Sequence, residues 1–258
     1  MGLEQIYHFR LALDKRSRGL FPEARGKAGP AFDKAVEGRI RATLEPLAGI
    51  IQALLVSKRE IRLTWQAGQA QAESPVKSAV RLSRGNAAQG VLLLELFLSG
   101  QPDNPELLYA LGMAYCEQNA LERAIELLAR LVELAPGHVN GRVAKGAALL
   151  QAGRITEGVS ELEKAVRQDP ENLWAHHSLG AGLMLLNRYS EAAANLRLAR
   201  EIDPQDQPAW FDYGQALEAM GEPEQAEMAY GKTIEIDEFS GVAEQARQRK
   251  ERLEGKKI

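Results

Sequence analysis

The sequence predicts an all-α protein, a right-handed α-solenoid made of stacked helix–turn–helix units. Two observations predict this fold. Several kinds of residue recur every 34 positions over most of the chain, and apolar residues follow helical spacing between these positions. Because one helix pair cannot bury its own apolar face, consecutive pairs are expected to stack.

Four columns of residues define the repeat, and each has a physical role. Gly and Asn tolerate the left-handed conformation that ends a helix. Proline cannot continue a helix interior but can open the next helix. A glycine column lets two helices approach closely, and a fourth column is apolar. The four columns are Gly85/Asn119/Gly153/Asn187/Gly221, Pro102/Pro136/Pro170/Pro204, Gly112/Gly146/Gly180/Gly214 and Leu94/Leu128/Leu162/Leu196/Tyr230.

These columns resemble the tetratricopeptide repeat (TPR) family. The unit VNGRVAKGAALLQAGRITEGVSELEKAVRQDPEN and the one after it match the family pattern closely. The first unit departs from it at Lys77, Ser78, Arg81 and Gly90, as terminal repeats often do. The predicted units are 71–104, 105–138, 139–172, 173–206 and 207–240. The resemblance implies a scaffold or adaptor whose first helices line a concave groove.

The two ends of the chain lie outside the repeat. Residues 241–258 predict a polar capping helix that begins after Ser240. Residues 1–70 predict an N-terminal helical extension, with a break at Pro46. This extension either packs as a hairpin on the first repeat or serves dimerisation or partner docking, and it could also occupy the groove. Its predicted coiled-coil seam consists of Ile40, Leu44, Leu47, Ile51, Leu54, Ile61 and Trp65.

Charge is distributed unevenly along the chain. Residues 1–70 carry 12 basic and 7 acidic side chains, whereas residues 71–240 carry 14 basic and 25 acidic ones. An acidic array argues against a nucleic-acid partner, because phosphate binding requires Lys and Arg. The split leaves a homo-oligomer open, in which the basic segment of one copy docks on the acidic array of another.

No pattern in the sequence predicts catalysis. The chain has no Walker loop, no nucleophile elbow and no HExxH motif. A single cysteine, Cys116, excludes a cysteine-rich zinc site. We therefore expect no enzyme activity, no metal and no cofactor. The longest apolar run, PLAGIIQALLV, is too short for an integral membrane segment, and a cytoplasmic protein is expected.

The candidate binding residues follow from helical geometry. Positions 2, 5, 9 and 12 of a unit form one stripe of its first helix, and aromatic residues and Met are typical of protein interfaces. This stripe predicts a groove for an apolar peptide or amphipathic helix of a protein partner, unless some of its residues are buried internally. Its predicted residues are Tyr109, Met113, Asn140, Val143, Leu150, Trp174, His177, Met184, Phe211 and Gln215.

Two adjacent histidines, His176 and His177, need a separate interpretation. Neighbouring residues on a helix point about 100° apart, so this pair is not expected to chelate one metal ion. The repeat frame places His176 at a packing position and His177 on the groove stripe. In the TPR proteins that bind a terminal carboxylate, Lys, Asn and Arg line this stripe, and here those residues are replaced by Tyr109, Met113, Val143 and Ala147.

Overall fold

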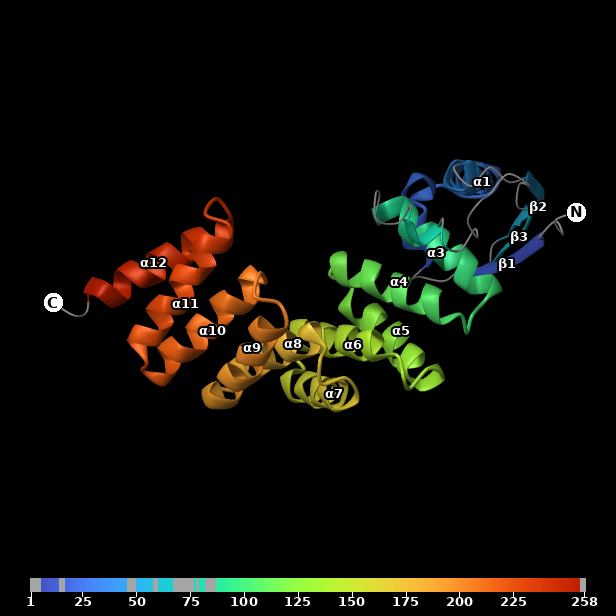
Figure 1. The fold of residues 1–258 in the computed structure, drawn as a ribbon. Helices are drawn as coiled ribbons and strands as arrows, with labels where there is room; N and C mark the ends of the chain where they lie inside the picture. The colour runs from blue at the N-terminus through green and yellow to red at the C-terminus, as the bar shows by residue number, and fades with distance from the viewer. Residues whose placement is uncertain are drawn as a thin grey trace, which may run out of the picture. The chain divides into compact units, whose positions relative to one another are not determined.

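A computed structural model describes residues 6–13, 17–45, 50–57, 60–66, 77, 79–81 and 87–255. The chain forms two compact units, Met1–Leu134 and Ala135–Ile258 (Figure 1). The first contains the strands β1 (Ile6–Ala12), β2 (Ile50–Val56) and β3 (Glu60–Gln66), the 3-10 helices η1 (Ser17–Leu20) and η2 (Pro22–Ala24), and the helices α1 (Pro30–Leu44), α3 (Ala87–Gly100), α4 (Pro105–Glu117) and α5 (Leu121–Leu134). The second contains α6 (Val139–Gln151), α7 (Ile155–Gln168), α8 (Leu173–Leu185), α9 (Tyr189–Ile202), α10 (Gln207–Met220), α11 (Pro223–Ile236) and α12 (Gly241–Gly255).

The first helix of each pair begins at a side-chain cap that recurs every 34 residues. A cap of this kind satisfies backbone N–H groups that have no partner inside the helix. In α8, the Asn172 side chain accepts a 3.0 Å hydrogen bond from the Ala175 N–H. The equivalent capping residues are Asn104, His138, Asp206 and, at the start of α12, Ser240.

The same helices end where the sequence predicts. Asn119, Gly153, Asn187 and Gly221 all have φ between +56° and +79°, the left-handed conformation that turns the chain into the second helix. Asn is one of the few residues other than Gly that adopts it readily. Gly85, the first member of this column, lies outside the described residues.

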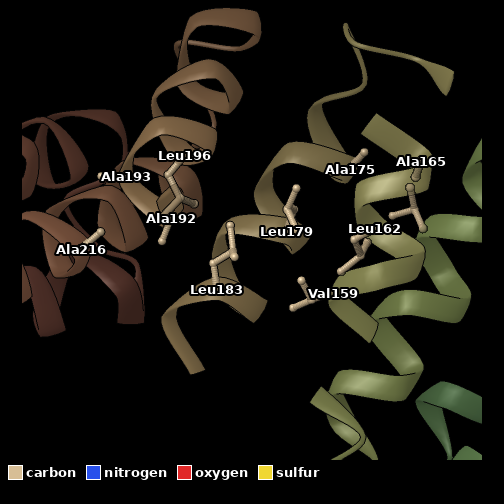
Figure 2. Packing of buried hydrophobic residues seen from close by; sticks show 11 residues of the cluster. Val159, Leu162, Ala165, Ala175, Leu179, Leu183, Ala192, Ala193, Leu196 and Ala216 are labelled. Atoms are coloured by element: carbon tan, nitrogen blue, oxygen red, sulfur yellow. The ribbon is translucent and has the colours of Figure 1, made fainter. Parts of the chain in front are cut away.

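Glycine holds the two helices of each pair close together. A Cβ atom at Gly180 would lie 2.5 Å from Cγ of Leu196, and one at Gly146 would lie 2.6 Å from Cγ of Leu162. In the second unit these leucines join one apolar core with Leu179 and Leu183 of α8 (Figure 2). The predicted stacking of helix pairs into an α-solenoid is thereby confirmed within this unit.

The N-terminal segment is not the predicted all-helical extension. Helix α1 is present and ends at Leu44, but β2 and β3 occupy residues for which a coiled-coil seam was predicted. Pro46, where a break was expected, lies outside the described residues. Together with β1, the strands β2 and β3 form an antiparallel sheet of order β1-β3-β2. Of the predicted seam, Ile40 and Leu44 lie on α1, Ile51 and Leu54 on β2, and Ile61 and Trp65 on β3; Leu47 lies outside the described residues.

Alternating burial explains the difference. Along β3, Ile61, Leu63 and Trp65 are buried whereas Arg62 is exposed. This two-residue period is typical of a half-buried strand. A seam with steps of three and four residues shares several apolar positions with it, so the helical interpretation was wrong for residues 50–56 and 60–66.

The sheet packs on α3, an almost wholly apolar helix. Phe97 of α3 makes edge-to-face contacts with Phe9 of β1 and Trp65 of β3, with ring centroids 5.1 and 6.0 Å apart. A Cβ atom at Gly100 would lie 2.8 Å from the carbonyl oxygen of His8, so α3 and β1 approach closely. This helix lies in the second half of the predicted unit 71–104, whose residues 71–76, 78 and 82–86 are outside the described part of the chain.

Adding a methyl group at Gly180 is expected to lower the stability of the second unit. Gly180→Ala places a Cβ against Leu196, and overpacking of this kind costs about 1–3 kcal/mol. Gly231→Ala is the matched control, since Gly231 lies inside α11 with nothing within 4 Å of the new Cβ, and alanine there should stabilise by about 0.5–1 kcal/mol. Urea unfolding followed by circular dichroism measures both. Equal midpoints for the two variants would contradict the close-packing account.

Candidate functional site

His176 has a structural role that recurs in the repeat. Its Nε2 atom donates to the carbonyl of Pro170 at 2.9 Å, and its Nδ1 atom lies 2.9 Å from the Asn195 side-chain amide. The residues at the same repeat position, Arg142 and Trp210, donate to the carbonyls of Pro136 and Pro204. Three different side chains therefore satisfy the same backbone acceptor, six residues upstream. This confirms the packing role predicted for His176.

His177 points elsewhere and joins two neighbouring helices. Its Nε2 atom lies 2.9 Å from Oδ2 of Asp212, so an ion pair forms between α8 and α10 when the imidazole is protonated. Burial alone would lower the pKa of His177. The hydrogen bond to Asp212 and the charges of Asp212 and Asp206 outweigh that effect and raise the pKa above its ordinary value.

A polar network continues from this pair to the C-terminal helix. Gln215 donates to Asp212 at 3.2 Å, and Arg249 of α12 donates both to Gln215 at 3.2 Å and to Glu218 at 2.9 Å. Glu218 also accepts a 2.7 Å hydrogen bond from the Tyr230 hydroxyl. Burial alone would raise the pKa of Glu218, but these hydrogen bonds lower it. The network holds Gln215, a residue of the predicted groove stripe on α10, in place.

Two of the predicted contact residues are buried inside the protein. Phe211 is only 8% exposed and lies in the C-terminal core, 5.8 Å from the Tyr230 ring. Val143 is 7% exposed and belongs to the core of the second unit. The prediction that they form part of an open groove is wrong for this structure. Phe211 is buried because α12 contributes Ala246 and Leu253 to the cluster in which its ring packs.

The other predicted residues differ in how far they reach the surface. In the first unit, Met113 of α4 is exposed and Tyr109 is half-buried. In the second unit Asn140 and Trp174 are exposed, whereas Leu150, His177, Met184 and Gln215 are half-buried. Leu150 and Met184 pack against the core of that unit. Only part of the predicted stripe is therefore open to a partner.

The most open apolar surface on the first helices of the second unit is one stripe of α8. Trp174 is 61% exposed, and Leu185 at the other end of the helix is 59% exposed. Eleven residues are close to three helical turns, so the two side chains lie on the same face about 16 Å apart along the axis. Ser178 and Ala181 lie between them. We call these four residues the α8 stripe.

Sequence reasoning missed Leu185, although the signal was present. The predicted stripe continued from Trp174 to Met184, whereas the spacing of eleven residues selects Leu185. Met184 turns toward the core instead.

Metal-binding groups and the single cysteine were considered as sites of chemistry. No group of three or more His, Cys, Asp or Glu side chains in the part of the chain that the structure describes is arranged to hold a metal ion. Cys116 is half-buried, and burial raises the pKa of its thiol, which disfavours the reactive thiolate. Among the described helices, none has the length and hydropathy needed to span a bilayer.

Family models match most of the repeat region. The model described as "Anaphase-promoting complex, cyclosome, subunit 3" matches residues 83–165. Two models described as "Tetratricopeptide repeat" match residues 143–207 and 183–238. Together these matches run from the start of α3 to the end of α11. No curated protein matches the chain significantly.

Solved structures of MamA proteins share the fold. MamA from strain AMB-1 is 26% identical with a TM-score of 0.56, and the match covers 65% of this chain and 100% of that one. MamA from strain MSR-1 is 26% identical, with a TM-score of 0.53 and coverage of 63% and 94%. MamA from Desulfovibrio magneticus RS-1 is 20% identical, with a TM-score of 0.56 and coverage of 66% and 99%; at this identity the likeness concerns the fold alone.

The pair of His177 and Asp212 makes stability depend on pH. Because the folded-state pKa of His177 is raised, the pair stabilises fully below the unfolded value of about 6.5 and loses this contribution as pH rises through the folded value. Asp212→Asn should lower the pKa of His177 in an NMR titration and remove that part of the pH dependence of unfolding. Glu224→Gln, a single-charge control on α11, should leave both unchanged. A wild-type His177 that titrates at or below 6.5 would contradict the assignment.

Proposed function

The chain is a tetratricopeptide repeat protein, and from this membership we propose that it is a non-catalytic adaptor that captures an apolar peptide or amphipathic helix of another protein. Family membership indicates a protein-interaction role, since repeat solenoids present extended binding surfaces. The proposal that the partner presents an apolar peptide or amphipathic helix rests on the α8 stripe, in which Trp174 and Leu185 are both exposed.

The composition of the stripe favours a helical or extended partner. Large apolar side chains at each end provide anchors, and Ser178 and Ala181 between them leave room for a close approach. An amphipathic helix presents apolar residues at similar intervals, so it can match both anchors at once. A tryptophan that becomes buried contributes a large area at low entropic cost, which is why tryptophan is frequent among residues that dominate binding energy.

The helices around the stripe supply a rigid support. Helix α8 packs between α6 and α10 and on its own second helix α9. The link from His177 to Asp212 and the bond from His176 to Pro170 fix its rotation. Because the stripe is held in one orientation, little conformational entropy is lost on binding.

The test is affinity capture from native lysate with quantitative mass spectrometry. The double variant Trp174→Ala/Leu185→Ala should reduce recovery of the specific partner at least tenfold, about 1.4 kcal/mol or more, with unchanged helicity by circular dichroism. Phe211 is not a suitable target, because it is buried and its truncation would destabilise the C-terminal core by about 3–5 kcal/mol.

A control pair keeps this test specific. Met228 and Phe239 are also exposed apolar residues of the second unit, but they lie on α11 and in the loop after it. Met228→Ala/Phe239→Ala should leave capture unchanged. If the control pair abolishes capture and the α8 pair does not, the binding surface lies elsewhere on the protein.

A second candidate function is self-assembly through the N-terminal segment. The observation that favours it is the charge split, with five net positive charges in residues 1–70 and eleven net negative charges in residues 71–240. On the outer face of the sheet, the exposed Arg10 and Arg62 lie opposite each other in the register, with Glu60 bound to both. Opposite charges on two copies would attract at low ionic strength.

Light scattering coupled to size-exclusion chromatography distinguishes this alternative. A scaffold of this kind should form dimers or larger species at about 0.05 M salt and dissociate at about 0.5 M salt, because exposed charges are screened there. The variant Arg10→Glu/Arg62→Glu should shift the equilibrium toward the monomer. A full-length chain that stays monomeric at every salt concentration would eliminate self-assembly.

A further inference from the structure

The surroundings of the α8 stripe carry a charge pattern that narrows the kind of partner. Helix α8 itself has no acidic side chain, no lysine and no arginine, and α10 carries Asp212 and Glu218 but no basic residue. On the other side, Arg142 and Lys145 of α6 both bind Glu161 of α7, at 3.1 and 3.6 Å. Because Glu161 also pairs with Lys164 at 2.8 Å, this single carboxylate offsets only part of the positive charge on the α6 side of the stripe.

Negative charge gathers at the Trp174 end. The loops that lead into α8 and α10 contain Asp169, Glu171, Asp203 and Asp206, which we call the acidic rim. In the part of the chain that the structure describes, none of these four carboxylates forms an ion pair. Trp174 lies only three residues after Glu171, at the start of α8. At the opposite end of α8 the nearby carboxylates already have a cationic partner, since Arg188 binds Glu191 at 2.6 Å and lies 3.9 Å from Glu163.

From this asymmetry we infer that the partner segment is a basic amphipathic helix, whose apolar residues cover the α8 stripe and whose lysine or arginine side chains lie over Trp174 and the acidic rim. The inference rests on the proposed function, since it names the partner of the same surface.

Three physical effects support a cationic end at this place. The carboxylates of the rim attract it, and charge complementarity of this kind speeds association and selects against acidic partners. A lysine or arginine can also stack on the exposed indole of Trp174, as Arg200 does on Trp210 in the same unit, at 4.4 Å from the ring centroid. The long aliphatic part of such a side chain adds apolar contact.

The pattern also predicts a direction along the stripe. Positive charge belongs at the end of the partner near Trp174, and an apolar residue belongs roughly three turns away over Leu185. A partner with its basic residues at the Leu185 end would place them beside Arg188, away from the rim. Direction is therefore a consequence that can be measured separately from affinity.

The probes are two stapled synthetic helices of roughly 18 residues with blocked termini and the same apolar face. One carries lysines and the other glutamates at one end, and stapling keeps their helix content equal. Isothermal titration against the full chain should show at least tenfold tighter binding of the lysine helix at low salt. The difference should shrink as salt rises, because salt screens the attraction between the lysines and the rim. A nitroxide label at the lysine end should broaden the NMR signals of Trp174 more than those of Leu185.

Matched variants distinguish the preference for a basic partner from binding at the α8 stripe itself. Asp169→Asn/Glu171→Gln/Asp203→Asn keeps the oxygens that accept from the Glu171 and Gln205 N–H groups and loses only the acceptor that Asp169 offers to the Asn172 amide. It should weaken binding of the lysine helix about tenfold. Neutralising three exposed carboxylates elsewhere in the same unit, Glu224→Gln/Glu238→Gln/Glu251→Gln, should change its affinity less than twofold.

Two results would overturn these statements in different ways. If both helices bind equally well and both depend on Trp174 and Leu185, the preference for a basic partner is wrong and the adaptor function stands. If binding is unaffected by Trp174→Ala/Leu185→Ala, the α8 stripe is not the binding surface and both statements fail.

Discussion

The close contact between a glycine of the first helix and a large side chain of the second helix is the constraint on which the repeat array depends. Gly146 meets Leu162, Gly180 meets Leu196 and, in the last pair, Gly214 meets Tyr230. Because glycine has no Cβ, the second helix packs directly against the glycine side of the first helix. The opposite side of the first helix is then turned outward. On α8 this outward side is the stripe from Trp174 to Leu185 that we propose as the binding surface.

Hydrogen bonds at the helix ends keep this arrangement in register. One side chain per pair caps the first helix, and another reaches back to the carbonyl of the preceding loop proline. The side chains that do this differ in chemistry, yet they reach the same atoms. His176 was expected at a packing position and not in a metal-binding pair with His177, and its hydrogen bonds show that it is a structural residue. Its neighbour His177 faces Asp212, so the two histidines serve different purposes.

The repeat could be predicted from the sequence because each of its columns has a local cause. Left-handed helix ends need Gly or Asn, and close helix pairs need Gly opposite a large side chain. The N-terminal sheet could not be predicted in the same way, since Ile61 and Trp65 fit both a helical seam and an alternating strand. Phe211 was also misplaced, because its burial depends on the packing of α12, a contact between segments distant in sequence. Leu185 was within reach of helical geometry and was overlooked in favour of Met184.

The central claim is that the α8 stripe is the surface that a partner covers. Hydrogen–deuterium exchange with mass spectrometry on the full chain, with and without the captured partner, tests it most directly. The account predicts that slowed exchange is concentrated in residues 169–185, which comprise α8 and the loop that carries Asp169 and Glu171. Slowed exchange confined to the sheet of residues 6–66 or to α11 and α12, with residues 169–185 unchanged, would contradict it.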